Sequence, residues 1–280
     1  MKQNEPKRHL FIPDTQIRPG VPTDHVDWIA QAIVDYLPDV VIVGGDWFDM
    51  PSLNGHEKPG SLPMEGARYD KDIEVGNEAF ARLCAPMEKE QARRKRNKAV
   101  HWNPRKIFLT GNHEDRCDRA ALNDPKWFGH IGSENCDVRD FERYGFLERV
   151  TVDEILYAHF FRQQHSNFPI GGEIPNRLNK IGCSFVQGHE QGFRYGNKIL
   201  ASGKTIHGVQ AGSAYLQVED YRGAQGQNHF RGIIILNEVE AGDFCIMPLS
   251  LKYLCRKFER KSLFDYMAAK YRGQDWTHLK

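Results

Sequence analysis

Five short stretches of this 280-residue chain carry the carboxylate, amide and imidazole side chains that hold divalent cations in proteins. In chain order they are Asp14-Thr15-Gln16, Gly45-Asp46-Trp47-Phe48-Asp49, Gly111-Asn112-His113-Glu114, the single His159, and Gly188-His189-Glu190-Gln191. One such stretch alone is a weak indication of a metal site. Five of them in order predict a shell of oxygen and nitrogen ligands, which suits Mn²⁺, Fe or Zn²⁺.

Each stretch lies at the end of a short apolar run, and such runs are typical of buried strands in a layered α/β protein. We predict strands over residues 9–13, 40–43, 107–109, 155–160, 184–188, 230–236 and 244–249. Ligands in α/β folds bind beyond the carboxyl ends of the strands. The polar residues at these strand ends should therefore meet at one edge of the molecule.

A helical pattern separates the first two predicted strands. Apolar residues recur at helical spacing from Val26 onwards, with Thr23 or Asp24 as the cap and Pro38 at the end. Strand, helix and strand then form a right-handed βαβ unit. Further helices are predicted over about 65–98, 115–122 and 140–144. The last residues, 273–280, are expected to fray.

Composition narrows the class of protein. The 38 Lys and Arg residues nearly cancel the 37 Asp and Glu residues, which argues against a chain that coats nucleic acid but leaves a local basic face open. Aromatic content is too high for a disordered chain. No apolar run approaches the roughly 18 residues of a membrane helix, and the run at 10–12 is too short for a signal peptide. Six cysteines without a CxxC pair indicate reduced thiols, so we expect a cytoplasmic enzyme with no membrane partner.

The five stretches resemble the motifs DxH, GDxxD, GNH[DE], H and GHxH of the calcineurin-like metallophosphoesterase superfamily. Gly212-Ser213 is similar to a later glycine-serine turn of that superfamily. The segment GNHEDR, followed by a β-rich second half, looks most similar to phage- and bacterial-type members, and a phage-encoded protein would act in the host cytoplasm. The resemblance implies an α/β fold of four layers, with two mixed β-sheets packed face to face and flanked by helices. We expect one domain over 1–280, with a partly helical, cap-like insertion at about 50–105.

The resemblance also implies a dinuclear metal-dependent phosphoesterase, in which a metal-activated water attacks the phosphorus of a phosphodiester or phosphomonoester. Asp46 would bridge two metal ions. Asn112, His159 and His189 would complete the second site, and Asp14 would belong to the first.

Other residues of the same motifs would act on the substrate. His113 is not a metal ligand in the family, so it can stabilise or protonate the leaving oxygen, and Asp49 would orient its imidazole. Asn112 would contact the non-bridging phosphoryl oxygens. Arg116, one turn into the following helix, could bind a substrate phosphate, although an exposed helix-face arginine is the commoner role for this position.

Gln16 and Gln191 stand where the motifs DxH and GHxH have histidine, and both of those histidines serve the first metal in the family. A glutamine oxygen reaches about as far as a histidine nitrogen, so the shell could keep its geometry and become richer in oxygen. Such a site should prefer Mg²⁺ or Mn²⁺ and bind it more weakly. We expect two divalent ions, foremost Mn²⁺ or Mg²⁺, with Fe or Zn²⁺ open at the second site. The alternative is that the two glutamines mark a decayed site.

Three functions stay open at this point. The first is a phosphoesterase, with a phosphodiesterase ahead of a protein phosphatase. The second is a DNA or RNA nuclease that uses the same site and grips the nucleic-acid backbone with the basic run Arg93 to Lys98, a run that is more often a solvated helix end. The third is a metal-poor pseudoenzyme that acts as a binding module. The natural substrate and the oligomeric state are not indicated.

The glutamine interpretation predicts the behaviour of the double variant Gln16→His, Gln191→His. Two imidazoles in place of two amide oxygens should raise the affinity of the first site and shift its preference towards Zn²⁺. Metal titration followed by elemental analysis measures both effects. Unchanged stoichiometry and unchanged metal preference would refute this reading of the first site.

Overall fold

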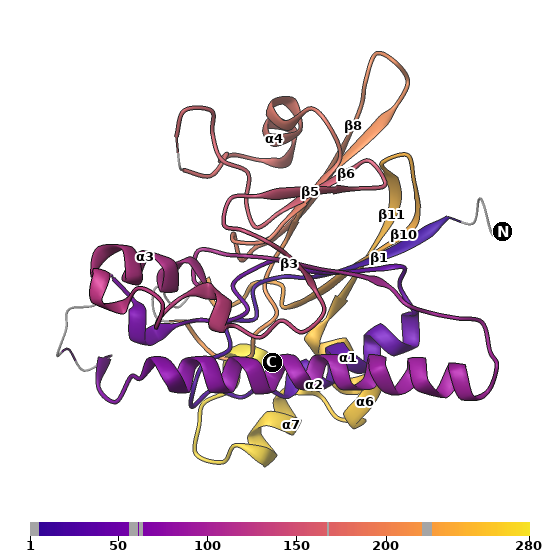
Figure 1. Ribbon diagram of the computed structural model, residues 1–280. Helices are drawn as coiled ribbons and strands as arrows, with labels where there is room; N and C mark the ends of the chain where they lie inside the picture. Colours follow the sequence, from indigo (N-terminus) through magenta and orange to yellow (C-terminus); the bar gives the residue numbers. More distant parts are fainter. Residues whose placement is uncertain (1–5, 56–60, 62–63, 167, 220–225) are drawn as a thin grey trace.

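A computed structural model of the chain describes residues 6–55, 61, 64–166, 168–219 and 226–280. Two mixed β-sheets lie face to face, with helices on the outside of both (Figure 1). The predicted four-layer α/β sandwich is therefore confirmed. All seven predicted strands are present, with limits that differ by a few residues.

The first sheet has the strand order β11-β10-β1-β2-β3-β4. Its parallel strands are β1 (Lys7–Ile12), β2 (Val40–Val43), β3 (Arg105–Leu109) and β4 (Glu142–Tyr144). Antiparallel pairing adds β10 (Gly232–Glu240) and β11 (Asp243–Ser250) at the other edge. All four residues of β2 are buried, because a central strand of a covered sheet has no solvent face and is apolar throughout.

The second sheet has the order β5-β6-β7-β9-β8. Its strands are β5 (Arg149–Val152), β6 (Ile155–Ala158), β7 (Phe185–Gln187), β8 (Phe193–Ile199) and β9 (Thr205–Ala211). The central strands β6, β7 and β9 are parallel, whereas β5 and β8 pair antiparallel at the two edges. The carboxyl ends of β6 and β7 therefore point to the same edge of this sheet.

Helices cover the outer face of each sheet (Figure 1). Below the first sheet lie α1 (Asp24–Tyr36), α2 (Tyr69–Arg96), α6 (Leu251–Glu259) and α7 (Leu263–Lys270). Above the second sheet lies α4 (Ile174–Ile181), and α3 (Asp115–Asn123) follows the end of β3. Short 3-10 turns are η1 (Pro51–Leu53), η3 (Pro125–Trp127), η4 (Ser133–Asn135) and η6 (Thr277–Leu279).

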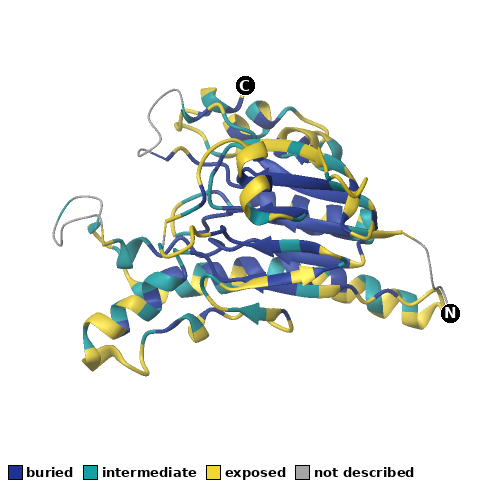
Figure 2. Ribbon diagram, turned by 90° about the horizontal axis from the view of Figure 1, so that it is seen from above, coloured by how far each residue is buried: buried dark blue, intermediate teal, exposed yellow. Residues whose placement is uncertain are grey.

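Successive strand residues face different layers of the core. Leu10 of β1 packs towards the helices, and its neighbour Phe11 packs between the sheets against residues such as Tyr157 and Val186. Figure 2 shows the strands as the buried centre of the molecule, with exposed surface on the outer helices. The parallel pairing of β1, β2 and β3, and of β6 with β7, sets the edge at which the polar stretches emerge.

The basic run Arg93 to Lys98 lies at the C-terminal end of α2, a helix of 28 residues and therefore about 42 Å long. Arg93 and Arg94 both form ion pairs with Glu90. The chain that follows the run is fixed at the amino-terminal end of the strands, because the indole of Trp102 donates to the Pro38 carbonyl, which precedes β2 (2.8 Å). The run therefore lies at the opposite edge from the carboxyl ends of the strands.

Two predictions of local structure were wrong. The predicted helix at 140–144 is instead the edge strand β4, which pairs with β3 and is held there by ion pairs from Arg105 and Lys106. The predicted fraying at 273–280 is also wrong, since Trp276 and Leu279 are buried in the core. Both segments are too short for hydrophobic periodicity to indicate their partners, which lie elsewhere in the chain.

The predicted cap-like insertion at about 50–105 is described only in part, because 56–60 and 62–63 lie outside the described residues. Its largest described element is α2, whose Phe80, Leu83 and Met87 belong to the core below the first sheet. Among the helices that the structure describes, none combines the length and apolar character that a membrane crossing requires.

The burial of His25 in α1 predicts that the free energy of unfolding depends on pH. The side chain is fully buried, and neither ring nitrogen has a hydrogen-bond partner among the described residues. Burial lowers the pKa of His25 to about 3. The unfolded chain takes up a proton near pH 6.5 and the folded chain does not, so the free energy of unfolding falls as the pH drops through this window.

We expect His25→Leu to be more stable than the parent by about 1 kcal/mol at pH 7.5, because two unpaired nitrogens are removed. At pH 4.5 the difference should grow by roughly 2 to 3 kcal/mol, since this pH is about two units below the unfolded pKa. Urea unfolding at both pH values measures the difference. The exposed His130→Leu variant is the control. A His25→Leu variant with the parent's pH dependence would contradict the assignment.

Candidate metal centre

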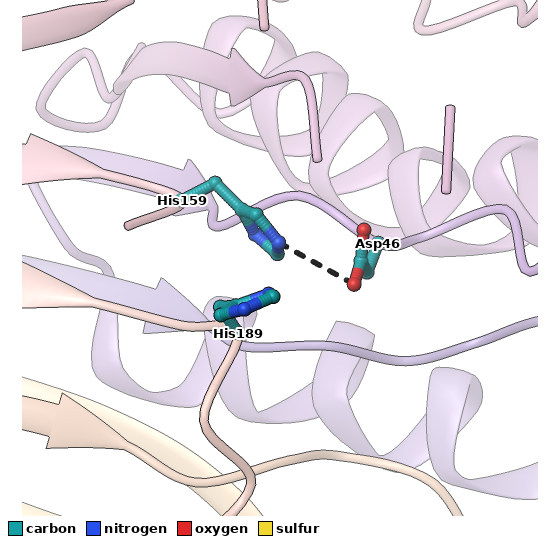
Figure 3. Close-up of side chains that lie close together, drawn as sticks. All are labelled: Asp46, His159 and His189. Carbon is teal, nitrogen blue, oxygen red and sulfur yellow. Dashed lines mark ion pairs between the residues drawn. The ribbon is translucent and has the colours of Figure 1, made fainter. Parts of the chain in front are cut away.

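Residues at the ends of three strands place their ligand atoms together. Asp46 follows β2, His159 follows β6 and His189 follows β7, and one ligand atom of each lies within 4.8 Å of the others. The three side chains point towards one another in Figure 3, where the dashed line joins His159 Nε2 to Asp46 Oδ2 (3.4 Å). Because Asp46 comes from the first sheet and the histidines from the second, the cluster lies where the two sheets meet.

Asn112 completes the group predicted for the second metal. Its Oδ1 atom lies 3.0 Å from Nε2 of His159 and 2.9 Å from Nδ1 of His189. One amide oxygen thus faces two imidazoles beside the Asp46 carboxylate. This donor set of one carboxylate, one amide oxygen and two imidazoles fits a divalent transition metal. An ion bound here would replace the hydrogen bonds between these groups.

The ring of His159 is held in one orientation. Its Nδ1 atom lies 2.8 Å from the Gly44 carbonyl, to which it donates, so Nε2 faces the cluster. Burial lowers the pKa of His159, but the charges of Asp46 and Asp14 outweigh it and raise the pKa to about 9. For His189, burial and the nearby His159 lower the pKa to about 4. A metal ligand must be a neutral imidazole, so a cation that enters here displaces a proton from His159.

Asp14, predicted for the first metal, lies next to the cluster and is fully buried. Its Oδ1 atom accepts the backbone N–H of His189 (2.9 Å), and its Oδ2 atom has no hydrogen-bond partner among the described residues. Burial and the charge of Asp46 raise the pKa of Asp14. A buried carboxylate oxygen without a donor is costly unless a cation binds it. The residues present therefore also fit a cation on the side of Asp14.

Gln16 and Gln191 are both buried near this group, but each already has contacts that the sequence did not indicate. The Gln191 amide oxygen accepts the hydroxyl of the buried Tyr215 (2.6 Å). The backbone N–H of Gln16 donates to the Asp46 carbonyl (2.9 Å). The structure thus fixes the positions of both glutamines, and their role as ligands of the first metal stays a prediction.

Glu114 holds the two strand-end loops of the first sheet together, a role that sequence reasoning missed although the residue belongs to the GNHE motif. Its buried carboxylate accepts three backbone N–H groups, from Asp46 (3.0 Å), Phe48 (2.8 Å) and Gly111 (2.8 Å). Burial, with the charge of Asp46, raises the pKa of Glu114. The loops approach so closely that a Cβ atom at Gly111 would lie 2.1 Å from Oδ1 of Asp46.

The backbone of the site is strained at several residues. Gln16, Asp46, Met50 and His189 have φ values of 46°, 51°, 52° and 63° and so occupy the left-handed region, which is unfavourable for residues other than glycine. Such strain persists only where surrounding contacts hold the backbone. For Asp46 these contacts include the hydrogen bond from its N–H to Glu114.

His113 and Asp49 form the pair that the sequence predicted to act on the leaving group. His113 Nδ1 lies 2.7 Å from Asp49 Oδ1, and its Nε2 lies 3.7 Å from Asp46 Oδ2. Burial lowers the pKa of His113, but the charges of Asp46 and Asp49 outweigh it and leave the pKa raised. Arg116 adjoins this pair, because it donates to the Asp49 carbonyl (2.8 Å) and lies 3.2 Å from His113 Nε2.

A cavity of about 1170 Å³ is lined in part by Phe160, the residue after His159. The Phe160 ring packs against His189, with 4.7 Å between the ring centroids. The cavity is lined by aromatic residues and by three cationic side chains, those of Arg149, Arg162 and Lys180, against one carboxylate.

Comparison with known proteins adds little to this geometry. No family model matches the chain, and no curated protein matches it. Among solved structures, it is similar to YfcE, a phosphoesterase from E. coli, at 12% sequence identity and a TM-score of 0.35, over 87% of this chain and 99% of that one. A likeness this distant carries no conclusion about residues or activity, which rest on the contacts above.

The Glu114 contacts predict the effect of Glu114→Gln. An NH₂ group in place of one carboxylate oxygen would face backbone donors, so the loops of Asp46 and Gly111 should separate. We expect the free energy of unfolding to fall by about 3 kcal/mol and the affinity for Mn²⁺ to fall about tenfold or more. Urea unfolding and titration calorimetry measure these effects, with the exposed Glu134→Gln as control. Parent-like Mn²⁺ affinity in Glu114→Gln would show that the loops do not depend on this carboxylate.

Proposed function

We propose that the protein is a phosphoesterase of the calcineurin-like type that uses two divalent metal ions, foremost Mn²⁺ or Mg²⁺, to hydrolyse phosphodiesters or phosphomonoesters. The observation that carries the proposal is the convergence of Asp46, Asn112, His159 and His189 on one point beside the His113–Asp49 pair. Metal ligands alone also occur in structural sites. A histidine that is held by a carboxylate next to them supplies the group that hydrolysis of an ester needs.

The residues divide between holding the ions and acting on the substrate. Asp46, Asn112, His159 and His189 would hold one ion, and Asp14 with the two predicted glutamines would hold the other. When bound, such ions polarise the phosphoryl group and lower the pKa of a water molecule so that it can act as nucleophile.

His113 is suited to deliver a proton to the leaving oxygen. Its Nδ1–H donates to Asp49, which favours the imidazolium. Nε2, on the side of Asp46, would carry the second proton once the Arg116 guanidinium, which can only donate and now lies 3.2 Å from it, turns to the substrate. Arg116 adds positive charge beside Nε2, where negative charge develops on the leaving group. Asn112 turns its oxygen towards the imidazoles, so its NH₂ group is the part that would donate to a phosphoryl oxygen.

The cavity at Phe160 favours a phosphodiester over a phosphomonoester. A diester has a second organic arm. The cavity is not lined by the residues of the candidate metal centre, but its three cationic and several aromatic side chains would suit an anionic or aromatic arm that reaches past Phe160. A nuclease could use these cations. It could not easily use the basic run Arg93 to Lys98, which lies at the opposite edge of the sheet, at the far end of a helix of about 42 Å.

Two further expectations belong to this proposal. We place the enzyme in the cytoplasm, since all six cysteines are free and four of them are buried, as in a protein of a reducing compartment. We also propose that the chain acts as a single domain, with the insertion at about 50–105 contributing to substrate choice. The alternative of a metal-poor binding module would be favoured by a purified protein that neither retains nor takes up divalent ions.

The proposal predicts Mn²⁺-stimulated hydrolysis of methyl p-nitrophenyl phosphate and of methyl phenyl phosphate. Asp46→Asn should abolish both, because the candidate metal centre would lose the carboxylate of its Asp46–His159–His189 group. His113→Ala should lower kcat about 100-fold for the phenyl ester, whose leaving group needs a proton, and less than about tenfold for the p-nitrophenyl ester. Steady-state kinetics at several Mn²⁺ concentrations measure this, with the remote Arg82→Met as control. Activity that is independent of metal and of Asp46 would refute the proposed function.

A further inference from the structure

The two carboxylate oxygens of Asp49 have different partners. Oδ1 lies 2.7 Å from His113 Nδ1, and Oδ2 accepts a hydrogen bond from Arg18 Nη1 at 2.6 Å. Both the Asp49 and the His113 side chains are largely buried, and the Arg18 side chain is only 23% exposed. The carboxylate is therefore fixed at both ends, and His113 contacts only one of them.

Glu219 in turn fixes Arg18. The same Nη1 atom of Arg18 lies 2.9 Å and 3.1 Å from the two carboxylate oxygens of Glu219, whose side chain is 6% exposed. Gln217 donates to the same Glu219 carboxylate (3.1 Å), and Gln227 donates to the Glu219 carbonyl (2.6 Å). Arg18 thus joins two buried carboxylates, and the second of them, Glu219, is itself held by Gln217 and Gln227.

The backbones of Arg18 and Asp49 are also tied to each other. Ile17, which precedes Arg18, donates its N–H to the Trp47 carbonyl (2.7 Å), and Asp49 donates its N–H to the Ile17 carbonyl (3.0 Å). These bonds join the loop after β1 to the loop after β2. These backbone hydrogen bonds therefore hold the guanidinium of Arg18 and the carboxylate of Asp49 close to each other.

We propose that Arg18 and Glu219 are positioning residues that set the orientation of Asp49 and, through it, the imidazole of His113. The inference rests on the proposed function, because it assigns a purpose to the His113–Asp49 pair. Its physical basis is that a carboxylate bonded only to His113 can turn about its Cβ–Cγ bond, whereas the bond to Arg18 fixes its plane. Glu219 keeps Arg18 in place and balances its charge, so that Asp49 remains available to His113.

The loss of Arg18 should act on the proton delivered to the leaving group. Without the guanidinium, the buried carboxylates of Asp49 and Glu219 lose the cation that they share, and Oδ2 of Asp49 loses its partner, so Asp49 should turn away from its present position. Displacement of a catalytic group by about 1 Å can cost roughly 100-fold in rate. The metal cluster has no direct bond to Arg18 among the described residues, so substrate binding to the ions should change little.

The test compares Arg18→Met and Glu219→Gln with the parent in the full-length, Mn²⁺-loaded protein. For methyl phenyl phosphate we expect kcat to fall about 30-fold in Arg18→Met and about 5-fold in Glu219→Gln, with KM changed by less than about 3-fold. For methyl p-nitrophenyl phosphate both variants should lie within about 3-fold of the parent. Arg18→Lys keeps one donor and should recover part of the loss. Arg82→Met is the matched control, because Arg82 also bonds a carboxylate, that of Asp27, but lies in the helical layer.

The outcomes separate this inference from the proposed function. Equal losses for the two esters in Arg18→Met would overturn the positioning role and leave a structural ion pair. The positioning role is also overturned if the loss of kcat differs between the two esters in His113→Ala but not in Arg18→Met. In that case the proposed phosphoesterase function still stands. A crystal structure of either variant gives a readout that needs no activity. A His113–Asp49 contact unchanged from 2.7 Å would also overturn the inference, and a rotated Asp49 carboxylate would support it.

Discussion

Three carboxyl groups, those of Asp14, Asp46 and Glu114, are buried together at the carboxyl ends of the strands, and the site depends on how their charge is balanced. Each carboxylate is matched in a different way. Glu114 accepts three backbone N–H groups, Asp46 faces the imidazoles of His113 and His159, and Asp14 accepts one backbone N–H and has a second oxygen without a hydrogen-bond partner among the described residues. Buried carboxylates without such partners would be protonated or would destabilise the fold. The burial of these three carboxyl groups at one edge of the sandwich therefore depends on the partners that each of them has.

Asp46 links all parts of this arrangement. Its Oδ1 atom accepts the N–H of His113, its carbonyl accepts the N–H of Gln16, and its own N–H donates to Glu114. It does so in a left-handed conformation, which turns the side chain and both backbone groups to different partners. The loops after β1, β2 and β3 therefore form one unit, and displacement of one of them would alter the candidate metal ligands and the His113–Asp49 pair together.

Much of the fold and of the central cluster could be predicted from the sequence. An apolar run followed by a polar stretch, as at Val43 and Asp46, indicates where a strand ends. It thereby indicates that the polar residues lie at the carboxyl-terminal edge of the sheet. Strand β9 could not be found in this way, because His207 interrupts its apolar pattern. The structure explains this histidine, since its ring lies between the hydroxyl of Tyr195 (2.8 Å) and the carboxylate of Asp243 (2.5 Å).

The contacts that support the cluster were beyond prediction for a different reason. Arg18 and Glu219 are about 200 residues apart in the chain, and neither stands in a recognisable motif. Tyr215 and Gln191 are similarly joined only by the fold. A single sequence indicates which residues have suitable chemistry. It does not indicate which distant side chain restrains them, because that choice depends on where the strands of both sheets end.

The ligands of the candidate centre come from both halves of the sandwich, Asp46 and Asn112 from one and His159 and His189 from the other. A cation bound by all four groups would cross-link the two sheets. Only the assembled sandwich offers all four groups, so the ion would bind the native state far more tightly than the unfolded chain. Free metal that binds these groups would then raise the free energy of unfolding and lower the share of unfolded chain that proteases can cut.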